Sequence, residues 1–187
     1  TGDVKQYKTF MEALKRSSPV PITFEHMEAG KDGYFSIREQ RIALRDDMSE
    51  IQTVAAAIHE IAHSKLHNHE KEKQAIKAED GAPLPKPKDR HTEEVEAESI
   101  AFAVCTYYGI KTDENSFGYI ASWSKGKELS ELRSSLELIN KTSSALIGDI
   151  DRHFAELAKE QDLEQAPEHL AYQVGELYFS IQETEGG

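Results

Sequence analysis

The chain contains almost no cysteine, since Cys105 is the only one among its 187 residues. A single cysteine cannot form an internal disulfide, and such usage is typical of the reducing cytoplasm, so we expect a cytoplasmic protein. Long apolar runs are also missing, because no stretch approaches the ~18 consecutive apolar residues of a membrane span. We therefore expect no contact with a membrane.

Positive charge is scarce as well. The 22 lysines and arginines are outnumbered by 34 aspartates and glutamates, which gives a net charge of −12. Binding to nucleic-acid phosphates requires a basic surface, so we expect no direct nucleic-acid binding by this chain. The length suits one domain with its own core, and we predict a single domain over residues 1–187. Because the sequence begins with Thr1 and Gly2 rather than methionine, we expect this domain to be excised from a larger protein.

A His-Glu-x-x-His motif organises the sequence. His59 and His63 are four residues apart and therefore share one face of a helix. Two imidazoles so placed can bind one Zn²⁺ through ring nitrogens at about 2.0–2.1 Å. Glu60 can accept a proton from the attacking water and later pass it to the leaving amine. The motif thus predicts a zinc site with Glu60 as general base.

The surrounding residues predict that this motif lies on a helix with one buried face. Ser49 is the expected N-cap, and Gln52 completes a capping box with it, so the helix should run from about Glu50 to His67. Apolar residues then recur at steps of three and four. They are Ile51, Val54, Ala55, Ile58, Ala62 and Leu66.

The rest of the pattern predicts an α+β fold, in which a small, mostly antiparallel sheet packs on a predominantly helical domain with the motif helix at its centre. Asp3 and Thr92 are expected helix N-caps, Gly109 a helix end, and Gly148 a bend. The charged and proline-rich segment 68–90 is expected to be a mobile loop inserted in the domain. Helices are predicted at 4–16, 91–108, 127–159 and 167–181, and strands at 20–27, 34–37 and 41–45.

A catalytic zinc site needs a third protein ligand, with water at the open position. His69 stands six residues past His63, where metzincins place their third histidine. The glycine that lets the metzincin chain turn is replaced here by Leu66, and no Met-turn follows, which disfavours this alternative.

The other source of a third ligand is a glutamate-rich helix. Glu94 and Glu98 are four residues apart on one face, so one carboxylate could bind the metal while the other orients a ligand histidine. We expect Glu93 and Glu96 to belong to the solvated face of this helix.

Three motifs in this order resemble a known family. The His59–His63 motif, then Glu94-x-x-Ala97-Glu98, then Ala101-Phe102, resemble the zincin-like peptidase domain of the ImmA/IrrE family. With the segment 119–123 (Tyr-Ile-Ala-Ser-Trp), the chain is still more similar to the metallopeptidase domain of ArdC-like antirestriction and polyvalent proteins. The resemblance covers about residues 42–154. Two features depart from it: the ImmA/IrrE pattern has asparagine where Glu98 stands, and the 68–90 segment is an insertion.

The resemblance implies a gluzincin-like fold, zinc bound by His59, His63 and Glu94, Glu60 as general base, and a larger parent protein on a mobile element. The chain would then hydrolyse peptide bonds of a protein substrate. A developing oxyanion needs one more donor, for which Tyr119 and His153 are candidates. An exposed strand within 34–45 could hold an extended peptide by strand addition.

Two other functions remain open at this point. The chain could be a binding module that keeps a zincin fold and its metal but cleaves nothing, within an antirestriction or DNA-transfer protein. The intact Glu60 favours the enzyme, because a binding module has no need of a general base. A DNA-binding antirestriction module is disfavoured by the net charge of −12.

Overall fold

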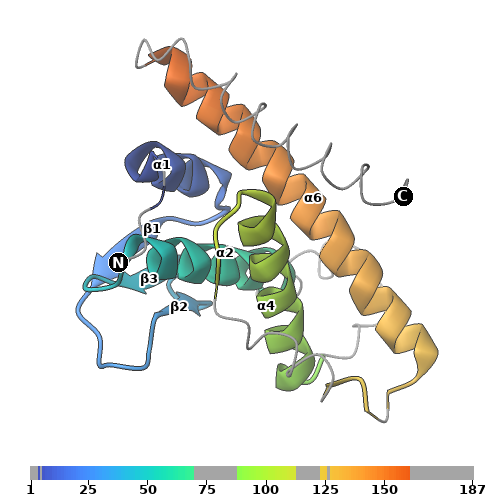
Figure 1. Ribbon diagram of the computed structural model, residues 1–187. Coiled ribbons are helices and arrows are strands. Elements are labelled where there is room, and N and C mark those ends of the chain that lie inside the picture. Colours follow the sequence, from blue (N-terminus) through green and yellow to red (C-terminus); the bar gives the residue numbers. More distant parts are fainter. Residues whose placement is uncertain (1–3, 5, 70–87, 113–122, 126, 161–187) are drawn as a thin grey trace, which may run out of the picture.

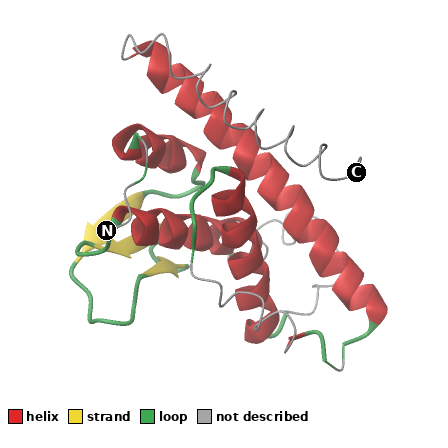
Figure 2. Cartoon of the chain, viewed as in Figure 1, coloured by secondary structure: helices red, strands yellow, loops and turns green. Residues whose placement is uncertain are grey.

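The computed structural model describes residues 4, 6–69, 88–112, 123–125 and 127–160. These ranges form an α+β fold that is mostly helical, with a small sheet on one side (Figures 1 and 2). None of the helices in these ranges is long and apolar enough to cross a membrane. The elements are α1 (Tyr7–Ser17), β1 (Ile22–Glu25), β2 (Gly33–Ser36), β3 (Arg41–Arg45), α2 (Glu50–Leu66), α4 (Arg90–Tyr107) and α6 (Leu129–Glu160).

The sheet is mixed, with the order β1-β3-β2, and the expectation of a mostly antiparallel sheet is wrong. β2 and β3 correspond to the strands predicted at 34–37 and 41–45, and they pair as an antiparallel hairpin in which Tyr34 lies opposite Ala43. Its turn is closed by Gln40, whose side-chain amide donates to the carbonyl of Ile37 at 2.6 Å. β1 lies on the other side of β3 and runs parallel to it, because residues 26–32 carry the chain past β3 to the far edge before the hairpin begins.

Helix α2 forms as its local sequence predicts. The Ser49 side chain accepts from the Gln52 backbone amide, and the Gln52 side chain accepts in turn from the Ser49 amide at 3.1 Å, which completes the capping box. The centre of the apolar stripe of α2 is fully buried at Val54, Ile58 and Ala62, while Ile51, Ala55 and Leu66 are partly buried against the same core. This stripe packs on β2 and β3 on one side and on α4 on the other, so α2 lies between the sheet and the other helices.

The start of α4 differs from the prediction. Asp89, not Thr92, is the N-cap: its carboxylate accepts from the Thr92 backbone amide at 3.0 Å and from the Thr92 hydroxyl at 2.6 Å. These Thr92 contacts hold the pKa of Asp89 well below its usual range. At the other end, Gly109 has the left-handed φ of 68° that the sequence predicts for a residue past a helix end.

The longest helix, α6, covers α4 and reaches α1 (Figure 1). It runs unbroken through Gly148, where a bend was expected. Near its end, Glu160 accepts two hydrogen bonds from the Arg16 guanidinium of α1, at 3.1 and 3.0 Å. The expected cap Asp3, most of the loop predicted at 68–90, the segment around Tyr119 and the helix predicted at 167–181 lie outside the described residues.

Candidate metal centre

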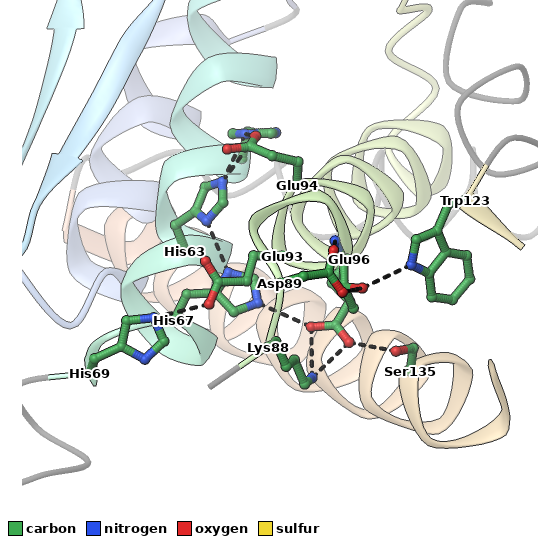
Figure 3. Close-up of polar contacts among 12 residues, drawn as sticks. His63, His67, His69, Lys88, Asp89, Glu93, Glu94, Glu96, Trp123 and Ser135 are labelled. Carbon is green, nitrogen blue, oxygen red and sulfur yellow. Dashed lines mark hydrogen bonds and ion pairs between the residues drawn. The ribbon is translucent and has the colours of Figure 1, made fainter. Parts of the chain in front are cut away.

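The two motif histidines converge with one glutamate of α4. The Nε2 atoms of His59 and His63 are 3.1 Å apart, and Oε2 of Glu94 lies 3.5 Å from each of them. Figure 3 shows Glu94 reaching from α4 toward the α2 histidines. Within the described part of the chain, these three residues are the group that could hold a metal ion.

The geometry and chemistry of this group fit zinc. Ligands held at 2.0–2.1 Å in a tetrahedron lie about 3.4 Å from one another, close to the three separations observed. Two imidazole nitrogens and one carboxylate oxygen are the donors that catalytic zinc sites use, with the fourth position left open. The Glu94 side chain is 37% exposed, so the group is accessible from solvent.

The charges of the three side chains are coupled. Burial acts to lower the pKa of His59, but the Glu94 and Glu98 carboxylates outweigh it and raise that pKa to about 9. The same contacts with His59 and His63 hold the pKa of Glu94 far below its usual range. Glu94 is therefore an anion at neutral pH, which is the form that binds a cation.

Glu98 lies behind His59, where the sequence spacing places a carboxylate that could orient it. Its Oε2 is 3.3 Å from Nδ1 of His59. This is an ion-pair distance, but among the described residues His59 Nδ1 has no partner at a hydrogen-bonding angle. The orienting role of Glu98 stays a prediction.

Glu60 is buried between α2 and the sheet, with only 9% of its surface exposed. Burial raises its pKa, against the opposing effects of the two histidines and of the Phe35 backbone amide, which hydrogen-bonds to it. β2 passes very close to this side chain: a Cβ on Gly33 would lie 3.4 Å from Glu60 Cγ and 2.9 Å from the Ala43 carbonyl oxygen. The lack of a side chain at Gly33 thus lets β2 hold Glu60 against the sheet.

Two further residues of this region, His67 and Glu96, were not predicted from the sequence. Glu96 was expected on a solvated helix face, but it is fully buried, because it lies where α4 meets both His67 at the end of α2 and Ser135 of α6. Glu93, assigned to the same face, is half-buried, and its Oε1 lies 2.9 Å from Nε2 of His69. One available signal was that His67 continues the four-residue spacing of His59 and His63.

The remaining candidates do not join the group. Both ring nitrogens of His153 contact its own helix, with Arg152 Nη2 at 3.3 Å and Glu156 Oε2 at 3.1 Å. This placement gives no support to His153 as an oxyanion donor. The other candidate, Tyr119, lies outside the described residues.

Comparison with known proteins gives one informative similarity. The chain is 34% identical over 123 residues to an uncharacterized, plasmid-encoded protein of Bacillus anthracis, pXO2-81. The match covers 65% of this chain but only 19% of the relative, so the chain spans about a fifth of that protein's length. No family model matches the chain, and no solved structure matches it.

Proposed function

We propose that this chain is a zinc-dependent metallopeptidase of the His-Glu-x-x-His type, which hydrolyses peptide bonds of a protein substrate. The observation that supports this most strongly is the convergence of His59, His63 and Glu94 at tetrahedral spacings, with the carboxylate of Glu60 buried beside them. A group that only bound metal would not need this fourth residue.

Each residue has a definite role in the proposal. His59, His63 and Glu94 would hold the ion, which when bound supplies Lewis acidity toward a substrate carbonyl and toward water. Glu60 accepts the proton of the attacking water on its carboxylate and delivers it to the leaving nitrogen. Its raised pKa suits this task, because a carboxylate that is more basic accepts a proton more readily near neutral pH. The Phe35 amide holds the carboxylate in place.

The free edge of β2 is the proposed position of the substrate backbone. The Arg45 amide donates to the Asp32 carbonyl, and Tyr34 lies opposite Ala43, so residues 32 and 34 pair with β3. The backbone groups of Gly33 and Phe35 therefore point to the opposite edge. The Phe35 amide is bonded to Glu60 there, which leaves both Gly33 groups and the Phe35 carbonyl for an added peptide. Among the described strands none lies on that edge. An extended peptide that adds there runs past the general base.

The proposed context is a larger protein of a mobile element. Its support is the similarity to a plasmid-encoded protein, of which the matched segment makes up 19%. A peptidase domain within such a protein would process either its own parent chain or a host protein.

Zinc content and one substitution test the proposal. Protein purified without chelator should carry about one zinc per chain by elemental analysis. A pool of unstructured peptides, analysed by mass spectrometry, should be cleaved by the parent protein and not by Glu60→Gln, which keeps the zinc but cannot accept the proton. Absence of zinc even after titration would contradict the metal site. Zinc binding with no cleavage by either protein would instead favour the non-catalytic binding module.

A further inference from the structure

A chain of short contacts leads away from His63 into the protein interior. Nδ1 of His63 is 2.9 Å from Nδ1 of His67, and Nε2 of His67 is 3.0 Å from Oε2 of Glu96 (Figure 3). His67 is 3% exposed and Glu96 is fully buried. The contacts join the end of α2 to the middle of α4. The roles proposed above for His59, Glu60, His63 and Glu94 do not involve His67 or Glu96.

Glu96 is held as a buried anion by further partners. Lys88 Nζ lies 2.7 and 2.8 Å from its two oxygens, and the Ser135 hydroxyl of α6 donates to it at 2.6 Å. Burial acts to raise the pKa of Glu96, but His67, Lys88 and Ser135 outweigh it and lower that pKa. A buried carboxylate without such partners would be strongly destabilising, so this set of contacts is a built feature of the fold.

The proton positions along this chain follow from Glu96. An ionised carboxylate only accepts hydrogen bonds, so Nε2 of His67 must carry a proton. In a neutral His67 ring, Nδ1 is then the acceptor, and the proton between the two rings must belong to Nδ1 of His63. Nε2 of a neutral His63 is left with a free lone pair, and this is the atom that lies 3.5 Å from Glu94.

We propose that His67 and Glu96 are positioning residues, which fix both the tautomer and the ring orientation of His63 so that its Nε2 can bind a metal ion. This inference rests on the proposed metal site. The network reaches from α2 through α4 to α6, so three helices together set the direction of one ligand. Neither His67 nor Glu96 contacts the metal position itself.

Zinc affinity, measured by competition with a chromophoric chelator, tests the role of His67. His67→Phe keeps a planar ring but can neither accept from His63 nor donate to Glu96, and should lower the affinity about 10–100-fold. His67→Asn places an oxygen near the former Nδ1 and should recover part of the loss. The matched control is His69→Phe, which removes a histidine two residues away that pairs with Glu93 instead. It should bind zinc like the parent.

Side-chain ¹⁵N NMR separates positioning from a purely structural role. In the parent protein, His63 should carry its proton on Nδ1 and His67 on Nε2, with the His63 proton protected from exchange with solvent. That protection should disappear in folded His67→Phe. If His67→Phe fails to fold, the same zinc affinities are measured for Glu96→Gln and Ser135→Ala. Both should lose less affinity than expected for His67→Phe, and Ser135→Ala should lose the least.

The outcomes are distinguishable. A His67 ring protonated on Nδ1, or zinc affinities equal in the parent and in the network variants, would overturn the positioning network while leaving the metal site intact. A parent protein that shows the expected tautomers but binds no zinc would overturn the proposed function, and with it the purpose of the network.

Discussion

The two motif histidines are one helical turn apart and are supported in opposite ways. His63 is backed by His67 and a fully buried Glu96. His59 is backed by Glu98, whose side chain is 44% exposed and which lies at an ion-pair distance without a hydrogen-bonding angle. Exposed charge pairs contribute little and are screened by salt, whereas a buried charge is costly to leave without its partners. Two histidines of one motif can therefore be oriented by different environments: buried residues contact His63, and a half-exposed carboxylate contacts His59.

The largest effect should come from removing the buried support. Glu96→Ala leaves His67 without its acceptor and Lys88 without its partner, and it opens a cavity in the interior. We expect a loss of about 3–5 kcal/mol in the free energy of unfolding of the metal-free protein, measured by urea denaturation. The matched variant is Glu98→Ala, which changes a glutamate half a turn after Glu96 on α4. It should change this free energy by less than about 0.5 kcal/mol. Equal losses in the two variants would contradict the comparison.

The next largest effect should be a loss of zinc affinity that involves both histidines at once. Glu94 lies 3.5 Å from each Nε2, so Glu94→Ala removes a ligand that the two sides share. We expect a loss of zinc affinity larger than the about 10–100-fold that an orienting residue gives. Glu93→Ala, one residue before it, should bind zinc like the parent. If His69→Ala lost the metal while Glu94→Ala kept it, the metzincin-like alternative would be correct.

A third change perturbs the base while leaving both histidine supports in place. Gly33→Ala would put a Cβ 2.9 Å from the Ala43 carbonyl oxygen and 3.4 Å from Glu60 Cγ. We expect a destabilisation of about 1–3 kcal/mol from this overpacking, because the closest atom is backbone and cannot easily move. Peptide cleavage should fall and zinc affinity should not. A Gly33→Ala protein with the stability of the parent would contradict the close approach of β2 to Glu60.

The smallest effect on the metal should come from the exposed support. Glu98→Ala removes the carboxylate behind His59, and we expect a loss of zinc affinity of about 10-fold, the low end of the range for orienting residues. Because the contact is half-exposed, this difference from the parent should shrink as salt is added. The loss in His67→Phe should persist under the same conditions. Isothermal titration at two ionic strengths measures both.

The parts of the fold that depend on local chemistry were predictable from the sequence. The capping box of Ser49 and Gln52 and the turn at Gln40 are each decided within four residues of chain, and both are present. The grouping of His59 and His63 with Glu94 follows from helical spacing and the family resemblance. The spacing places His59 and His63 on one face, but their meeting with Glu94 also depends on the packing of α4 on α2.

The features that the sequence did not predict depend on contacts between distant segments of the chain. Nothing near Glu96 distinguishes it from its neighbours, because its burial depends on distant partners: His67 lies 29 residues away and Ser135 lies 39 residues away. The parallel pairing of β1 with β3 was missed for the same reason, since no local signal says on which side of a hairpin an earlier strand will lie.

The long reach of α6 has a consequence for the order in which the chain folds. The Arg16–Glu160 pair closes a loop of 144 residues, and Ser135 reaches Glu96 only when α6 lies on α4. Such long-range closure is slow compared with helix formation, and a chain leaving the ribosome presents its N-terminal elements first. The residues of α2 therefore leave the ribosome well before the support of His63 is complete. During synthesis, the motif is therefore made early, and the centre is fully oriented only after Ser135 has been added and α6 packs on α4.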